Sequence, residues 1–224
     1  MSTVLTLNTS SAKCSASLQR GDLLLERESA AQRQSAQRVL PMISELLNEA
    51  GIALSELDLI AVVAGPGSFT GVRIGIAVAQ GLGMSAAVPV VPLSSLALMA
   101  MACDCEQVLV SEEARDEELY FAAYQRSTER GVALVGQEQV AQIAGLAALP
   151  PEFAAASCCL AGDGWTHKEA LLKQLGCTAA SEPCAPVIEN RHIAALGLLR
   201  FQCGEAVEAA NLRPNYVKEQ LDYS

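Results

Sequence analysis

The chain has 224 residues, of which 51% are hydrophobic and only 4% are aromatic. This length allows one large domain or two small ones, and a core built from Ala, Val, Leu and Ile suits helices packed on buried strands. The 15 basic and 25 acidic residues give a net charge of −10. Since a protein that grips nucleic acid by itself needs a basic surface, this charge argues against a primary tRNA or DNA binder.

Eight cysteines are spread along the chain without a C-x-x-C pair, and the two histidines do not complete a zinc quartet. The first residues lack the basic and apolar regions of a signal peptide. The longest apolar runs fall short of the ~18 residues of a membrane span. We therefore expect a cytoplasmic protein that has no membrane association, binds no metal and keeps its cysteines reduced and mostly buried.

The first hundred residues alternate between strand and helix patterns. Residues 3–29 predict three strands in a meander. Residues 30–50 predict a helix that ends at Gly51, with Pro41 marking a kink or the start of a second segment. A buried strand within 55–64 then leads into a glycine-rich loop and a second helix. Residues 88–93 predict another strand, and Ser94 or Ser95 caps a short helix through Met101.

A second set of elements follows. The pattern predicts strands at 107–111, 119–126, 132–136 and 157–162, and helices at 138–147, 165–175 and 189–203. Strands that alternate with helices, twice over, indicate an α/β fold with two lobes. We expect a first lobe over 1–105, a second lobe over 106–205, and a tail over 206–224 that packs back on the first lobe.

The loop Gly65-Pro66-Gly67-Ser68-Phe69-Thr70-Gly71 ends a strand and opens a helix. Amide groups at a helix start attract anions, so Gly65, Gly67, Ser68, Thr70 and Gly71 are candidates for a nucleotide or anion loop. The loop nevertheless lacks the lysine of a P-loop, and its third glycine is one place late for a Rossmann pattern. The alternative is a turn in which Ser68 or Thr70 caps the helix.

Four small residues recur every four positions in the helix after this loop: Gly71, Gly75, Ala79 and Gly83. A glycine inside a helix costs ~1 kcal/mol relative to alanine, so this ridge predicts a close backbone approach. The neighbour is either a helix of the same chain or a partner. The helix over 30–50 is available to cover this face, and the two helices together could dock on a like pair from another chain.

Four blocks of the chain form a recognisable pattern: "GPGSFTGVRIG" is the strongest, supported by "LTLNTSSAKCSASL", "QRVLPMI" and the tail "RPNYVK". Together they resemble the bacterial TsaB (YeaZ) family of tRNA threonylcarbamoyladenosine biosynthesis. The resemblance covers most of residues 1–126 and implies the two-lobed, actin-like and sugar-kinase-like fold, with mixed sheets flanked by helices. It also implies a non-catalytic relative of the catalytic subunit TsaD.

The resemblance implies a subunit that binds TsaD and acts with TsaE to modify adenosine 37 in tRNAs that read codons beginning with A. It also implies a homodimer in isolation and tRNA contact only through the complex. The family's docking surface is the pair of helices, here about 35–50 and 70–83. The residues expected to bind the partner are Val39, Met42, Ile43, Leu46, Gly71, Val72, Gly75, Ile76, Ala79 and Gly83.

Catalysis by this chain is not expected. Asn8 stands where the family usually has an aspartate, which weakens binding of a hard cation. Ser68 could be a nucleophile, but nothing in the sequence brings His167 or His192 to it. The acidic run from Glu112 to Glu118 is either a metal site or a solvated loop. We expect no cofactor of its own, although ADP or ATP could lie at the interface with the partner. The alternative functions are an ATP-dependent phosphotransferase and a glycoprotease-type hydrolase.

Overall fold

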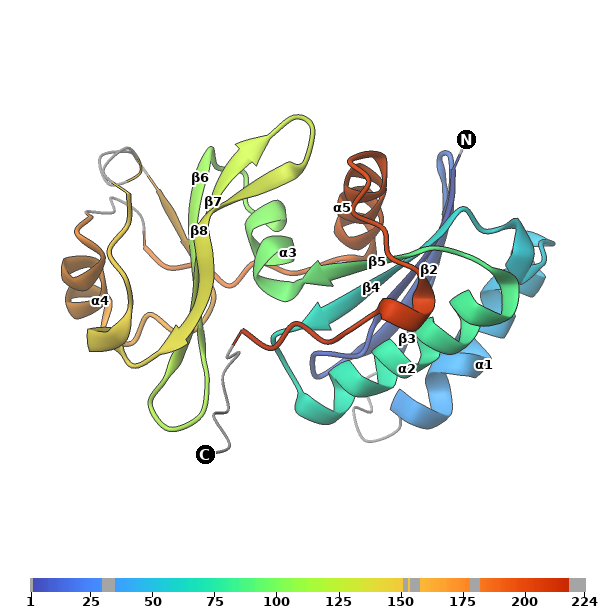
Figure 1. Ribbon diagram of the computed structural model, residues 1–224, viewed down its shortest axis with the longest axis horizontal. Coiled ribbons are helices and arrows are strands. Elements are labelled where there is room, and N and C mark those ends of the chain that lie inside the picture. Colours follow the sequence, from blue (N-terminus) through green and yellow to red (C-terminus); the bar gives the residue numbers. More distant parts are fainter. Residues whose placement is uncertain (1, 30–34, 151–152, 154–157, 178–181, 218–224) are drawn as a thin grey trace. The chain divides into compact units, whose positions relative to one another are not determined.

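A computed structural model describes residues 2–29, 35–150, 153, 158–177 and 182–217. The chain divides into two compact units, each with its own sheet (Figure 1). The first unit contains Met1–Ser95 and Glu189–Asn215, and the second contains Leu96–Ile188 and Tyr216–Ser224. The predicted α/β class, with mixed sheets flanked by helices, is confirmed.

The sheet of the first unit has the order β3-β2-β1-β4-β5. The three opening strands pair antiparallel as the predicted meander, whereas β4 and β5 join the sheet in parallel through helical connections. This mixture places the polar turn after β1 beside the glycine loop after β4, because the carboxyl ends of parallel neighbours lie at the same edge of a sheet. The strands are β1 (Thr3–Asn8), β2 (Cys14–Arg20), β3 (Leu23–Ser29), β4 (Leu59–Gly65) and β5 (Val90–Ser94).

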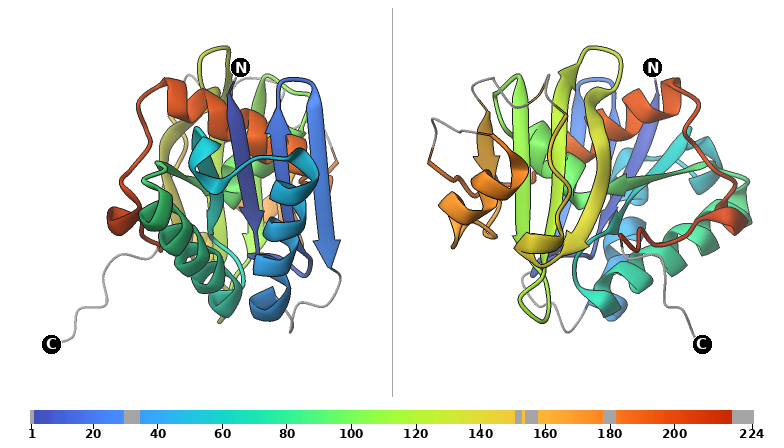
Figure 2. Two further views of the ribbon diagram at one scale, coloured as in Figure 1. Left: turned by 90° about the vertical axis from the view of Figure 1, so that its right-hand side faces the viewer. Right: turned by 60° about the vertical axis from the view of Figure 1, so that its left-hand side comes forward.

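Helices cover both faces of this sheet, α1 and α2 on one side and α5 on the other (Figure 2). Because side chains alternate along a strand, Ile60 and Val62 of β4 enter the core beneath α1 and α2, while Ala61 faces Gly197 of α5. Short 3₁₀ turns η2 and η4 complete the unit. The helical elements are α1 (Ser35–Ala50), η2 (Leu54–Glu56), α2 (Phe69–Ala86), α5 (Asn190–Gln202) and η4 (Ala209–Asn211).

The second unit is built on a sheet of order β8-β7-β6-β9, in which only the β6–β9 pair is parallel. Its apolar core includes Phe121, Leu160, Leu171 and Trp165, and the Trp165 Nε1–H donates to the Ala161 carbonyl at 2.9 Å. The elements of this part of the chain are α3 (Ser95–Ala102), β6 (Gln107–Glu113), β7 (Leu119–Ser127), β8 (Gly131–Ala141), η3 (Ile143–Gly145), β9 (Cys159–Ala161) and α4 (Lys168–Leu175).

The predicted division at 105/106 and the predicted extent of the second lobe are wrong. The units divide after Ser95, and residues 189–205 belong to the first unit because α5 packs on β1, β4 and β5. Residues 206–215 also belong there, and Val207 exchanges two backbone hydrogen bonds with Val90. Tyr216 and Val217 are assigned to the second unit, and the rest of the predicted tail, 218–224, lies outside the described residues.

Two smaller predictions also fail. The helix expected at 138–147 is a continuation of strand β8 to Ala141 followed by the short turn η3, because pairing with β7 extends as far as Leu119 opposite Ala141. The cysteines are not all reduced, since a disulfide joins Cys105 to Cys159. Pro41 lies inside a single helix, α1. Among the described residues, the structure contains no helix long and apolar enough to cross a membrane.

Candidate functional site

The glycine loop after β4 is held against the polar turn after β1. The Ser68 N–H donates to the Ser10 carbonyl at 2.8 Å, and the Thr9 hydroxyl donates to the Gly71 carbonyl at 2.7 Å. Asn8 stabilises the turn itself, because its Oδ1 accepts from the backbone N–H and the hydroxyl of Ser10 at 3.1 and 2.8 Å. Hydrogen bonds therefore join the two turns, and Asn8, Thr9 and Ser10 are buried.

Two glycines of the loop are required by the closeness of this contact. A Cβ atom added at Gly67 would lie 2.7 Å from the Ser10 carbonyl oxygen, and one added at Gly71 would lie 2.0 Å from the Thr9 carbonyl oxygen. Gly67 also has a φ of +151°, which side-chain-bearing residues rarely adopt. The glycines thus allow the chain's own backbone to approach.

The loop also caps helix α2. Ser68 is the N-cap residue, and its Oγ accepts from the Gly71 N–H at 3.3 Å, so the capped-turn interpretation is correct, with Ser68 rather than Thr70 as the cap. An anion at this helix start would compete for amide groups at Ser68 and Gly71 that already donate within the chain. A nucleotide or anion site at Gly65, Gly67, Ser68, Thr70 and Gly71 stays a prediction. The hydrogen bonds that the Ser68 and Gly71 amides already make count against it.

The glycine ridge of α2 faces the interior of the unit. Added Cβ atoms would lie 2.6 Å from the Thr9 hydroxyl oxygen at Gly75 and 2.7 Å from the Ala209 Cβ at Gly83. The neighbour that approaches this ridge is the chain itself, through the turn after β1 and the 3₁₀ turn η4. The helix over 30–50, expected as the covering neighbour within the chain, is not what approaches the ridge, and partner binding by the ridge stays a prediction.

The predicted docking residues share this burial. All ten are buried in the first unit. The apolar side chains among them pack in one core with residues of strands β1, β2 and β4. These side chains present little surface in the isolated chain, so their part in partner binding stays a prediction. The residues concerned are Val39, Met42, Ile43, Leu46, Gly71, Val72, Gly75, Ile76, Ala79 and Gly83.

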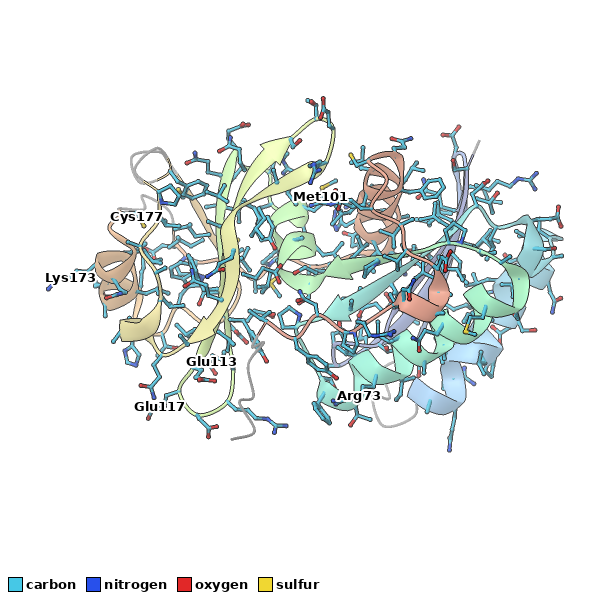
Figure 3. All side chains as sticks on the ribbon, viewed as in Figure 1. Arg73, Met101, Glu113, Glu117, Lys173 and Cys177 are labelled. Atoms are coloured by element: carbon cyan, nitrogen blue, oxygen red, sulfur yellow. A yellow bond between two sulfur atoms is a disulfide. The ribbon has the colours of Figure 1, made fainter. Side chains whose placement is uncertain are left out.

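The opposite side of α2 carries an exposed apolar stripe. Phe69 and Met84 are 61% and 65% exposed, and Ala77 and Gly81 lie exposed between them with no heavy atom near an added Cβ at Gly81. The Arg73 guanidinium stacks over the Phe69 ring at 3.3 Å, on the outer side of the helix (Figure 3). We call this set, Phe69, Arg73, Ala77, Gly81 and Met84, the outer stripe of α2.

Helix α1 adds a further exposed apolar residue. It contacts α2 along the same face of the sheet, and its Leu40 is 51% exposed. The sequence contained a signal for the outer stripe, because Phe69, Arg73, Ala77 and Gly81 also recur every four residues. What the sequence did not contain is which of the two four-residue stripes faces the sheet.

A second glycine turn lies in the second unit, after β9. Added Cβ atoms at Gly162 and Gly164 would lie 2.1 Å from the Ser111 carbonyl oxygen and 2.4 Å from its hydroxyl oxygen. The Glu113 N–H donates to Asp163 Oδ1 at 2.9 Å. Burial, and then the charge of Asp163, raise the pKa of Glu112 from its usual 4.5 to about 7. This turn is therefore acidic and can bind a proton near neutral pH.

Comparison with known proteins places these features in a family. The family described as "TsaD: tRNA N6-adenosine threonylcarbamoyltransferase" matches residues 28–182. Two solved structures from Pseudomonas aeruginosa match almost the whole chain: a protein with similarity to peptidase YeaZ (36% identity, TM-score 0.84, 97% of this chain and all of the other) and YeaZ itself (34%, 0.80, 96% and all). This chain belongs to the TsaB (YeaZ) family.

Two curated relatives of this TsaB-family chain carry the same name. "tRNA threonylcarbamoyladenosine biosynthesis protein TsaB" of Haemophilus influenzae is 44% identical over 133 residues, 57% of this chain and 56% of the relative. The Escherichia coli protein of the same name is 37% identical over 133 residues, 58% and 57% of the two chains. The aligned part of the chain thus spans little more than half the length of either curated relative.

The two histidines of this TsaB-family chain both lie at helix starts. His167 is the exposed N-cap residue of α4. His192 lies in the first unit, not in the second lobe as predicted, and its Nδ1 accepts from the Glu189 N–H at 3.1 Å at the start of α5. Burial lowers the pKa of His192. Among the described residues, the structure brings together no group of three or more His, Cys, Asp or Glu side chains that could hold a metal ion.

Proposed function

We propose that this chain is an accessory subunit of tRNA threonylcarbamoyladenosine biosynthesis. The observation that carries the proposal is its membership of the TsaB (YeaZ) family, whose curated members in Haemophilus influenzae and Escherichia coli are named for this pathway. The substrate of that pathway is a tRNA, and we therefore expect this protein to act in the cytoplasm. The net charge of −10 favours tRNA contact through a complex rather than by this chain alone.

We infer that the chain acts by binding a TsaD-type catalytic subunit, together with the ATPase TsaE, and that it pairs with itself when that partner is absent. The outer stripe of α2 and Leu40 of α1 supply the surface. Large apolar side chains at Phe69 and Met84 can be buried by a partner, and the small residues Ala77 and Gly81 between them let a second helix approach closely.

The turn after β1 packs against the glycine loop, and this contact supports an accessory role rather than a catalytic one. The turn Asn8-Thr9-Ser10 lies against the start of α2, and the side-chain Oδ1 of Asn8 already accepts two hydrogen bonds from Ser10. A phosphate or a hard cation at this place would have to displace those contacts. A nucleotide at the interface with the catalytic partner remains compatible with this arrangement, because the partner would supply its ligands.

Reconstitution tests the proposal. A TsaD-type protein, TsaE, ATP, threonine, bicarbonate and the enzyme that makes threonylcarbamoyl-adenylate are mixed with an unmodified tRNA that reads an ANN codon. We expect adenosine-37 modification, measured by nucleoside mass spectrometry, only when this chain is added. Full modification without it would contradict the proposal. Phosphotransfer or peptide hydrolysis by the isolated chain would favour the alternative functions instead.

A further inference from the structure

Six of the eight cysteines lie in the second unit, and they meet in pairs. Cys105 and Cys159 are joined by a disulfide. Cys184 lies close enough to Cys103 to add to the effect of burial, which raises the pKa of the Cys103 thiol, and Cys158 adds to burial at Cys177 in the same way. In the Cys105–Cys159 and Cys103–Cys184 pairs the two residues are far apart in sequence, so the fold brings each pair together.

The Cys105–Cys159 and Cys103–Cys184 pairs both lie at the β9 edge of the sheet. Strand β9 has only three residues, and the segment beyond it adds one bridge, through Cys184 opposite Ala161. That bridge consists of two backbone hydrogen bonds of 2.9 Å, from Cys184 N–H to the Leu160 carbonyl and from Gly162 N–H to the Cys184 carbonyl. Cys103 and Cys105 both lie in the short connection between α3 and β6. One connection therefore contacts β9 through Cys105 and the outermost segment through Cys103.

The thiols of the second pair differ in access. Cys184 is exposed, whereas Cys103 is buried and its carbonyl accepts from the Arg126 guanidinium. Burial raises the pKa of Cys103 to about 12, so this thiol is a poor first nucleophile. Cys158 and Cys177 are both buried, and burial raises the pKa of each. Within the two contacting thiol pairs, reagents in solution can reach only Cys184.

We propose that Cys103 and Cys184 form a second, reversible disulfide by exchange with a small-molecule disulfide of the oxidised glutathione class. The Cys184 thiolate attacks one sulfur of the reagent, which gives a mixed disulfide and releases one thiol. Cys103 then loses its proton and attacks Sγ of Cys184, which releases the second thiol. The protein dithiol is oxidised by two electrons and the reagent disulfide is reduced to two thiols. The product ties the outermost segment of the sheet to the connection before β6.

The experiment uses the purified full chain and oxidised glutathione, with intact-mass and non-reducing peptide analysis over time. We expect a transient glutathione adduct on Cys184, followed by its loss, a net loss of two hydrogen masses and a peptide that links Cys103 to Cys184. Cys184→Ser should form neither the adduct nor the link. Cys103→Ser should keep the adduct, because the resolving thiol is missing. Cys203→Ser, which removes the other exposed cysteine, should leave the Cys103–Cys184 link unchanged.

Three outcomes would overturn the proposal. The wild-type protein could retain the adduct as long as Cys103→Ser does, it could link Cys184 to Cys105 or Cys159 instead, or it could fail to react while its Cys184 is still alkylated by iodoacetamide. Cys184→Ser changes only an exposed side chain, so the comparison survives if Cys103→Ser does not fold. Addition of dithiothreitol should restore both thiols.

Discussion

The two glycine turns of this chain look alike in sequence and differ in chemistry. Each follows a strand, and each uses glycine so that its backbone can press on the neighbouring strand or its end, Thr9 and Ser10 in the first unit and Ser111 in the second. The first turn is uncharged and caps a long helix, whereas the second carries Asp163 beside Glu112. Glycines after a strand therefore report a close contact within the chain, and the neighbouring side chains decide which chemistry is present.

The largest effect is expected where the backbone approach is closest. Gly71→Ala places a Cβ atom 2.0 Å from the Thr9 carbonyl oxygen, so the two turns must separate. We expect a loss of about 3 kcal/mol in the free energy of unfolding, measured by urea denaturation. A loss below about 1 kcal/mol would show that the contact between the turns is looser than described and would remove one side of the comparison.

The acidic turn of the second unit should make stability depend on pH, which the uncharged turn of the first unit should not. The folded chain holds the Glu112 proton more tightly than the unfolded chain, so this residue makes the protein less stable as pH rises from 4.5 to about 7. Glu112→Gln should abolish that part of the pH dependence and stabilise the protein at pH 8 by on the order of 1–2 kcal/mol. Thermal unfolding of both proteins from pH 4 to pH 8 measures the difference, and parallel profiles would refute it.

The helix cap gives a smaller effect that belongs to the first turn alone. Ser68→Ala removes the acceptor of the Gly71 N–H and should cost about 1 kcal/mol. Ser68→Thr keeps an acceptor and should cost only a few tenths of that amount. If both variants lose equal stability in urea, the cap is not what Ser68 contributes.

The smallest effect is expected at a glycine outside the turns. Gly81 is exposed in α2, and an added Cβ would meet no atom within 4 Å. Gly81→Ala should therefore raise the free energy of unfolding by about 0.5–1 kcal/mol, because alanine is the better helix former. Urea denaturation beside Gly71→Ala, in the same helix, gives opposite signs if the inner and outer sides of α2 are correctly assigned.

Much of the fold could be predicted from local pattern. The meander over 3–29, the helix ending at Gly51 and the capped start of α2 depend on alternation, on a left-handed glycine and on a serine at the N-cap, and each is local. Strand β8 could not be separated from a helix over 138–147, because its extension depends on pairing with β7. The second unit's acidic turn was missed as a unit for the same reason, since Glu112 and Asp163 are distant in sequence.

The candidate site shows the same limit more sharply. The four-residue recurrence of Gly71, Gly75 and Gly83 predicts a close approach, and that approach exists. Its partner at Gly83 is Ala209, more than a hundred residues later in the chain, so no local pattern could assign the ridge to the interior. The residues expected to bind a partner lie on the buried side of the helix. The outer stripe has a similar recurrence and remains exposed.

Binding of a TsaD-type partner by the outer stripe of α2 is the central proposal for this protein. Calorimetric titration of a TsaD-type protein with Ala77→Glu tests it directly, because a charged side chain at this exposed position cannot be buried without a large desolvation cost. Ala170→Glu, at an exposed alanine of α4, is the matched control. We predict that Ala77→Glu weakens binding by at least about 100-fold, some 3 kcal/mol, while Ala170→Glu binds as the wild type does. Equal affinity of wild type, Ala77→Glu and Ala170→Glu would contradict the claim.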